Sequence, residues 1–173
     1  LDVCLKSCQK LHTVNLRANR LLDVSNANAC FPNVKSLDMS QNELLSVIGL
    51  AKLEKLEHLA INSNKLAFWS DMKLLSENCP DLQYLAFIDN PMCLFVFRDD
   101  IGKLASALFW SKKHMKINGL TPTALSLAQK IDVFKKYENI FRESSLIGAS
   151  TTITSVPSPQ YGSSAQSSPR KGG

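Results

Sequence analysis

The sequence lacks any long hydrophobic run. A helix that crosses a bilayer needs about 20 consecutive apolar residues, whereas the densest apolar stretch here is MCLFVF, residues 92–97. The sequence also shows no amino-terminal signal peptide. We therefore expect no membrane among the partners of this protein.

Glycosylation acceptors of the N-x-[ST] type are absent, and the sequence has no dense cluster of cysteines. The five cysteines are odd in number and widely spread: Cys4, Cys8, Cys30, Cys79 and Cys93. Both features favour reduced thiols and an intracellular location, cytoplasmic, nuclear or both. Cys4 and Cys8 have a spacing that some metal sites use, but no matching Cys or His pair follows, so buried thiols are the favoured interpretation.

Catalytic motifs are missing as well. The sequence has no G-x-S-x-G, no H-E-x-x-H, no glycine-rich phosphate loop and no dinucleotide fingerprint. One S-x-x-K match, at residues 70–73, lacks its supporting motifs, and the three histidines lie far apart. We expect a protein that is not an enzyme and that has no cofactor and no small-molecule substrate.

What the sequence does contain is a repeat. Four segments share the form apolar-x-x-apolar-x-apolar-x-x-Asn: LHTVNLRAN (11–19), VKSLDMSQN (34–42), LEHLAINSN (56–64) and LQYLAFIDN (82–90). Their first residues are 23, 22 and 26 positions apart. Self-similarity at such a period is typical of a solenoid, in which each repeat buries its apolar face against the next.

The spacing within one repeat predicts its structure. Leu59 and Ile61 are two residues apart, so they lie on the same face of a short strand. After the strand the chain turns, and the backbone N–H and C=O groups of this turn are buried away from water. The side-chain amide of an asparagine can both donate and accept, so it can form hydrogen bonds with these backbone groups. We predict that residues 14, 37, 59 and 85 lie on adjacent parallel strands, beside a ladder formed by Asn19, Asn42, Asn64 and Asn90.

These four segments resemble the leucine-rich repeat family, specifically its short intracellular class of about 22 residues typified by phosphatase-regulator repeats. The resemblance covers residues 1 to about 120 and implies an α/β solenoid with a curved parallel sheet. Residues 1–90 would form the repeats. Residues 1–10 look like the end of a repeat whose strand is missing, and we expect that an amino-terminal cap has been removed.

Residues 91–143 resemble the carboxyl-terminal cap of intracellular leucine-rich repeat proteins. Arg98 matches one element of that cap, and Ile117, Asn118 and Gly119 match another, with Asn118 in place of the usual Asp. A helix should follow over residues 121–141, with Thr121 as its N-cap. Its apolar stripe would cover the open end of the core or, alternatively, dock a partner: Leu127, Ile131, Phe134 and Phe141.

Residues 144–173 are rich in Ser, Thr, Pro and Gly, and we expect them to be disordered. Ser158 and Ser168 are each followed by proline, as in sites of proline-directed phosphorylation. Serine-rich tails also contain such dipeptides by chance. A phosphate on either serine would reverse part of the local positive charge.

With catalysis disfavoured, function must lie on a surface. In this repeat the third, fifth, seventh and eighth positions point outward from the concave face of the sheet. Six of these side chains are candidates for binding a protein partner: Arg17, Asp38, His58, Asn62, Tyr84 and Ile88. Tyrosine is a common interface anchor. The alternative is an ordinary mixed surface on which Arg17 and Asp38 form a solvated pair.

The chain carries a formal charge of +5, which permits an acidic partner without requiring one. Lys112, Lys113 and Lys116 form a short basic cluster that could contact RNA, although a solvated face with Trp110 packed inward is the favoured interpretation. We therefore expect a non-catalytic scaffold or adaptor that binds a protein partner. The alternative is a subunit of an RNA-processing or mRNA-export complex, since the spliceosomal branch-point subunit and TAP-type export receptors have similar repeats.

Overall fold

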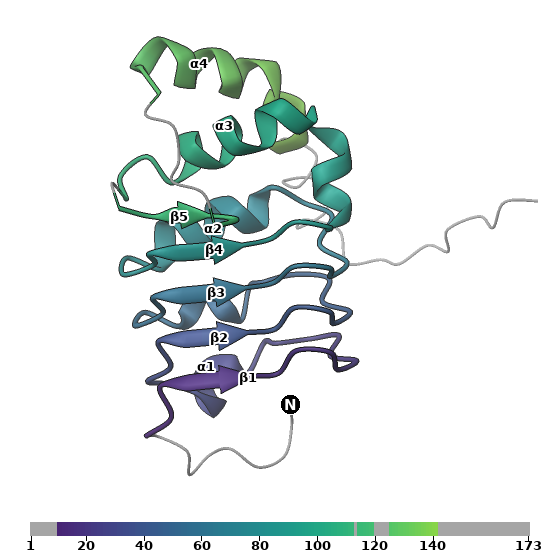
Figure 1. Ribbon diagram of the computed structural model, residues 1–173, viewed down its shortest axis with the longest axis vertical. Coiled ribbons are helices and arrows are strands. Elements are labelled where there is room, and N and C mark those ends of the chain that lie inside the picture. Colours follow the sequence, from purple (N-terminus) through teal and green to yellow (C-terminus); the bar gives the residue numbers. More distant parts are fainter. Residues whose placement is uncertain (1–9, 113, 120–124, 142–173) are drawn as a thin grey trace, which may run out of the picture.

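Five short parallel strands, stacked in chain order, form one sheet in the computed structural model (Figure 1). The structure describes residues 10–112, 114–119 and 125–141. The strands are β1 (Thr13–Asn15), β2 (Ser36–Asp38), β3 (His58–Ala60), β4 (Tyr84–Ala86) and β5 (Lys116–Ile117). Their registers align Val14, Leu37, Leu59, Leu85 and Ile117 in a single row. The predicted α/β solenoid of leucine-rich-repeat type is thereby confirmed, with β5 as a fifth strand.

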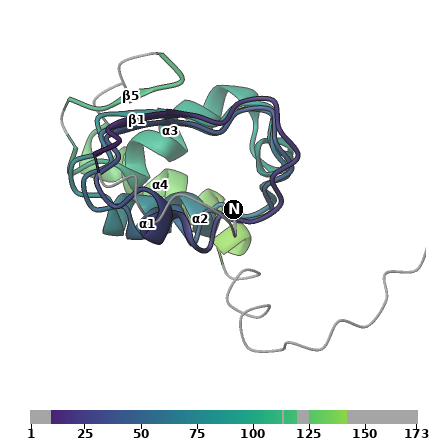
Figure 2. The same cartoon turned by 90° about the horizontal axis from the view of Figure 1, so that it is seen from below.

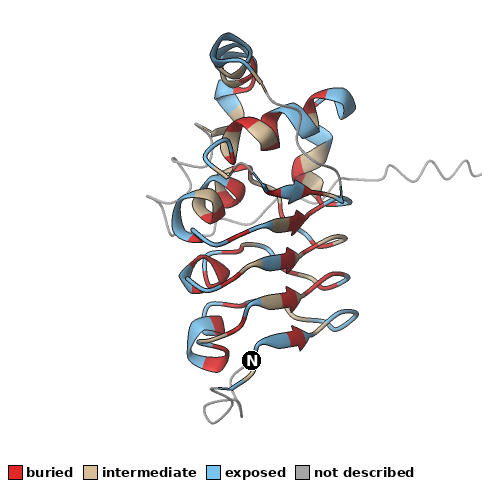
Figure 3. Ribbon diagram, turned by 60° about the vertical axis from the view of Figure 1, so that its left-hand side comes forward, coloured by how far each residue is buried: buried red, intermediate tan, exposed pale blue. Residues whose placement is uncertain are grey.

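The segments that return between strands lie on one side of this sheet (Figure 2). They contain α1 (Ala27–Cys30), the 3-10 turn η1 (Leu50–Lys52) and α2 (Ser70–Asn78). The core lies between these segments and the sheet. Val24, Val47 and Trp69 point into it, as their position after each strand predicts, and all three are almost fully buried. The central residue of each of the strands β1 to β4 is buried (Figure 3), and in β1 and β3 the residue before it, Thr13 or His58, is exposed.

Asparagine side chains connect successive repeats at the turn after each strand. Asn64 Nδ2 donates to the carbonyl oxygens of Met39 (3.0 Å) and Ile61 (3.1 Å), while its Oδ1 accepts from the Leu44 amide at 3.1 Å. Asn42 makes the same set of bonds one repeat earlier: it donates to the carbonyl oxygens of Leu16 and Met39 and accepts from the Leu21 amide. Asn90 makes them one repeat later: it donates to the carbonyl oxygens of Ile61 and Phe87 and accepts from the Leu66 amide. The predicted ladder is confirmed for these three asparagines, which are all buried.

Asn19 occupies the same position in the first repeat but is exposed. Its Nδ2 donates to the carbonyl oxygens of Leu16 and Arg17, both in its own turn. The residue before each asparagine has a positive φ of 52–58°, and these residues are Ala18, Gln41, Ser63 and Asp89. Each repeat therefore makes its turn with the same left-handed residue, although none of the four is glycine.

The return segments are tightly packed at Gly49. A Cβ built at this position would overlap the backbone carbonyl of Val24 in the preceding repeat. Gly102, on the exposed side of the cap, has no heavy atom within 4 Å of the same position. Only a residue without a side chain fits between successive turns at Gly49.

One carboxyl group is buried between the return segments. Asp71, in the first turn of α2, accepts a hydrogen bond from Ser46 Oγ at 3.1 Å through Oδ1. Its Oδ2 is buried and has no hydrogen-bond partner in the described ranges. Burial raises the pKa of Asp71 to about 6, and the hydrogen bond from Ser46 offsets this only in part.

The cap consists of the 3-10 turn η2 (Pro91–Phe95), α3 (Arg98–Leu108) and α4 (Leu127–Lys136). α3 packs on α2 and β5 and buries Leu104 and Ala105 at the end of the core, and α4 packs on α3. No helix in the described part of the chain combines the length and apolar character that crossing a membrane requires. The predicted tail, with Ser158 and Ser168, lies outside the described residues.

The cap helix differs from its prediction in two respects. Ser126, not Thr121, is its N-cap: Ser126 Oγ accepts from the Gln129 amide, and the Gln129 side chain accepts from the Ser126 amide. Thr121 itself lies outside the described residues. The apolar stripe is also shifted, because Leu127 is 74% exposed whereas Val133 and Tyr137 face α3. The sequence pattern could not show which side of α4 meets α3.

An acidic side chain joins the two cap helices. Asp100 on α3 accepts hydrogen bonds from Lys136 Nζ (2.6 Å) at the end of α4, from Tyr137 Oη (2.8 Å) directly after α4, and from Lys103 Nζ (2.9 Å) on α3. These bonds, that of Lys136 foremost, hold the pKa of Asp100 well below its usual range. The Asp100 carboxylate is therefore charged throughout the physiological range and fixes α4 on α3.

Candidate functional site

The side of the sheet that faces away from α1 and α2 is the predicted concave face, called the sheet face below. Strand register places its side chains in rows that run across the repeats. One row consists of Thr13, Ser36, His58, Tyr84 and Lys116, and the next consists of Asn15, Asp38, Ala60 and Ala86. The first row changes from the small Thr13 and Ser36 to larger side chains from β3 onward, while the second row changes from Asn15 and Asp38 to the small, apolar Ala60 and Ala86.

This change in side-chain size produces a hollow of about 240 Å³ on β2, β3 and β4. Its lining residues are Ser36, Leu37, Asp38, His58, Leu59, Ala60 and Tyr84. Ala60, whose side chain is small, lies in this lining between the larger Asp38 on β2 and the small Ala86 on β4. The structure thus brings together three of the six predicted partner-binding residues: Asp38, His58 and Tyr84.

Two rings form one wall of the hollow. The imidazole of His58 and the phenol of Tyr84 are stacked, with centroids 6.2 Å apart and planes 28° from parallel. They lie directly opposite each other on β3 and β4. Stacking holds both rings upright, so they present a pre-ordered aromatic surface to an incoming group.

Asp38 forms the opposite side of the hollow and carries its only carboxylate. Its Oδ1 accepts from the Ser40 amide at 2.9 Å, which fixes the side chain over its own turn. The predicted pair with Arg17 is not formed. Arg17 Nε instead donates to Gln41 Oε1 at 3.2 Å, because Gln41 occupies the neighbouring turn at a similar height.

The remaining two candidates lie at the turn after the strands. Asn62 Oδ1 accepts from the Ile88 amide at 2.9 Å, so part of the Asn62 side chain holds the adjacent repeat in place. The Ile88 side chain is 46% exposed. Ile88 therefore offers apolar surface beside the hollow, while Asn62 has a structural role in addition to any contact with a partner.

Two lysines of the predicted basic cluster, Lys112 and Lys116, have different surroundings in the structure. Lys112 Nζ donates to the carbonyl oxygens of Cys79 (2.6 Å) and Pro80 (3.0 Å), and burial lowers its pKa. Lys113 lies outside the described residues. Lys116 is exposed on β5 and lies opposite Tyr84 on the sheet face. Lys112 is therefore bound to carbonyl oxygens just before β4, whereas Lys116 belongs to the sheet face.

Lys116 could have been assigned to the sheet face from the sequence. Met115 and Ile117 are buried on either side of it, which is the alternation of a strand. Trp110, by contrast, was expected to pack inward, and this expectation is wrong. Its side chain is 65% exposed, and Lys130 Nζ lies 4.9 Å from the ring centroid.

No group of three His, Cys, Asp or Glu side chains that could hold a metal ion occurs in the described ranges. Cys79 is buried, and burial raises the pKa of its thiol to about 11. That thiol is therefore a packing group and not a nucleophile. Cys4 and Cys8, the pair with metal-like spacing, lie outside the described residues.

No protein-family model and no curated protein sequence matches this chain. Solved structures do resemble it. A chain of the Chaetomium Mex67:Mtr2 structure is 16% identical, with a TM-score of 0.42, covering 65% of this chain and 68% of that chain. A chain of the Drosophila melanogaster SNF/U2A' complex is 13% identical, with a TM-score of 0.43, covering 78% and 86%. At these identities both likenesses concern the fold alone.

Proposed function

We propose that this protein is a non-catalytic scaffold or adaptor that binds a protein partner through the sheet face. The observation that carries the proposal is the hollow between Asp38 and the stacked rings of His58 and Tyr84. A partner side chain in this hollow would contact two aromatic faces and a carboxylate at once. Such an arrangement combines buried apolar area with a polar group that selects orientation.

The support beneath the hollow also suits binding. Its floor is the parallel sheet, in which adjacent strands are hydrogen-bonded and the asparagine ladder fixes each turn. The surface is therefore ordered before a partner arrives, so little conformational entropy is lost there on binding. Ile88, in the turn after β4, extends the surface along the strands, and Lys116, on β5, extends it across them.

Site-specific photo-crosslinking on the full chain tests the proposal. A photoreactive amino acid at Tyr84 should give a covalent adduct with the same protein as one at Ile88. One at Lys52, exposed on η1 on the other side of the core, should not. The adduct formed from Ile88 should disappear with Tyr84→Ala and persist with Lys52→Ala. Equal crosslinking from Lys52 and Tyr84, or persistence with Tyr84→Ala, would contradict a binding role of the sheet face.

A subunit role in an RNA-processing or export complex is the second candidate, and one observation favours it. Lys116 and Tyr84 are directly opposite each other, and a cation beside an aromatic ring is a common arrangement for single-stranded RNA. RNA binding of this kind should weaken steeply between 50 and 200 mM salt, by about tenfold or more. Lys116→Glu should abolish RNA binding. Lys52→Glu changes the net charge by the same amount on the other side of the core, so it is the matched control and should leave RNA binding intact. A salt-independent affinity would exclude this role.

A further inference from the structure

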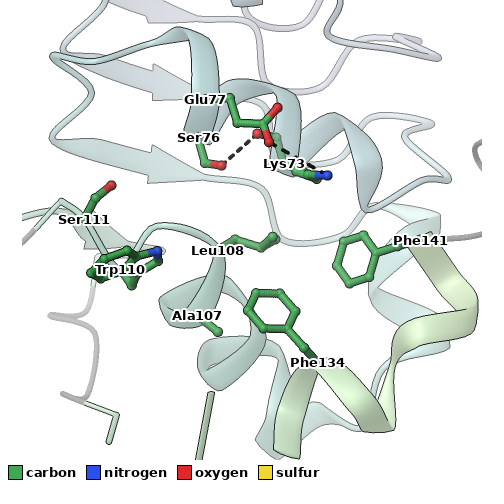
Figure 4. Close-up of a pocket in the computed structure, with 9 residues that line it drawn as sticks. All are labelled: Lys73, Ser76, Glu77, Ala107, Leu108, Trp110, Ser111, Phe134 and Phe141. Atoms are coloured by element: carbon green, nitrogen blue, oxygen red, sulfur yellow. Dashed lines mark hydrogen bonds and ion pairs between the residues drawn. The ribbon is translucent and has the colours of Figure 1, made fainter. Parts of the chain in front are cut away.

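A second concave surface lies on the α2 side of the molecule, away from the sheet face. It is a groove of about 470 Å³ between α2, the end of α3 and the cap helix (Figure 4). The apolar residues lining it are Ala107, Leu108, Trp110, Phe134 and Phe141. The polar residues lining it are Lys73, Ser76, Glu77 and Ser111.

The apolar side of this groove is exposed to an unusual degree. Trp110 is 65% exposed, and Leu108, Phe134 and Phe141 are only partly buried. The rings of Phe134 and Phe141 lie 6.1 Å apart at 59° and face the groove from the α4 side (Figure 4). Apolar side chains gathered in a groove lose unfavourable contact with water when an apolar segment packs against them, so the groove favours such an occupant.

The charged groups around the groove are already paired with groups of this chain. Lys73 Nζ lies 3.8 Å from Glu77 Oε1, one turn away on α2. Lys130 Nζ lies over the Trp110 ring. Ser76 Oγ donates to the carbonyl oxygen of Lys73 at 2.7 Å. An occupant with its own charge would gain little from these groups, so the groove fits a neutral, aliphatic segment.

We propose that the groove is covered by residues 144–151 of this same chain, with Leu146 and Ile147 against Trp110 and Phe134. Phe141 lines the groove and is the last described residue, and 32 residues follow it. Leu146 is five residues beyond Phe141, so it can reach any point within about 17 Å of it. From residue 144 to residue 169 the sequence carries no charged residue, which matches the groove.

Covalent connection makes this occupant favourable even if each contact is weak. A segment tethered a few residues from its site has an effective concentration in the millimolar range. A separate protein would have to reach that concentration in solution to compete.

Tryptophan fluorescence of the full chain provides a direct measurement. The chain has two tryptophans, and Trp69 is 1% exposed, so quenching by acrylamide reports mainly on Trp110. If residues 144–151 cover the groove, Leu146→Ser combined with Ile147→Ser should raise the quenching constant by about twofold or more. Tyr161→Ser, an apolar-to-serine change farther along, should leave it unchanged. Trp110→Phe should remove the difference between these variants.

The possible results are distinct. Unchanged quenching in the Leu146 and Ile147 variant would overturn the proposal, as would an equal rise with Tyr161→Ser. Protection of Trp110 that increases with protein concentration would show that a second copy covers the groove, and would overturn it too. The emission of Trp69 in the Trp110→Phe background serves as the check that each variant is folded. Sheet-face crosslinking should be unaffected by these changes, which separates this proposal from the proposed function.

Discussion

Replacing Asn64 by alanine tests the asparagine ladder most directly. The Asn64 side chain pairs with three buried or part-buried carbonyl oxygens and with the Leu44 amide. The two buried carbonyl oxygens keep a second donor after the change: Met39 O still accepts from Asn42, and Ile61 O from Asn90. Within the described residues the Leu44 amide donates to Asn64 alone, so the substitution leaves this one buried N–H group without an acceptor.

The expected magnitude follows from this arrangement. One buried unsatisfied donor costs about 1–3 kcal/mol, and the shared carbonyl oxygens add little. We therefore expect Asn64→Ala to lower the free energy of unfolding by about 2 kcal/mol. Asn19→Ala is the matched control, because Asn19 is exposed and bonds only within its own turn. It should change the free energy of unfolding by about 0.5 kcal/mol or less.

Urea unfolding followed by circular dichroism measures both variants. The midpoint for Asn64→Ala should fall while the slope m stays the same, since the native fold is retained. The reasoning would be refuted if the two variants were equally destabilised. It would also be refuted if Asn64→Ala unfolded at the wild-type midpoint, because the ladder would then contribute nothing measurable.

Three further changes have defined outcomes. Because burial raises the pKa of Asp71, wild-type stability should decline as pH rises from about 4 to 6. Asp71→Asn should remove that decline in urea titrations, with a gain of at most about 3 kcal/mol at pH 8. Asp100→Ala should speed amide hydrogen exchange in α4, whereas Asp99→Ala, a change of an exposed residue on the same turn, should not. Because the pKa of Asp100 is lowered in the folded state, its stabilising contribution should begin to decline as pH falls below about 4 and should be lost only below that lowered pKa. Gly49→Ala should lower the thermal midpoint sharply or prevent folding, whereas Gly102→Ala should raise stability by about 1 kcal/mol.

The repeats were predictable because their signal is local and periodic. Apolar residues two apart with an asparagine at a fixed distance recur four times, and each recurrence strengthens the same register. The buried row that contains Leu37, Leu59 and Leu85 follows directly from it. Part of the candidate site followed as well, since alternation along a strand fixes which side chains point outward.

The cap was predicted less well because its contacts are specific to this chain. Two neighbouring stripes on α4 are apolar, and the sequence does not show which of them meets α3. The structure selects the stripe that contains Val133 and Tyr137, where Tyr137 Oη reaches Asp100. The hydrogen bonds of Lys112 could not be predicted for a similar reason: its ammonium donates to two carbonyl oxygens about 30 residues away in the chain.

The sequence by itself determined the repeat, its strands and the row of buried aliphatic side chains, since each depends on residues close together in the chain. Only the tertiary structure decided that His58 stacks on Tyr84, that Lys116 lies beside them, and that Trp110 faces a groove. These arrangements depend on distances between residues that lie tens of positions apart. Such distances are set by how whole repeats and helices pack, and a pattern read along one strand or helix carries no information about them.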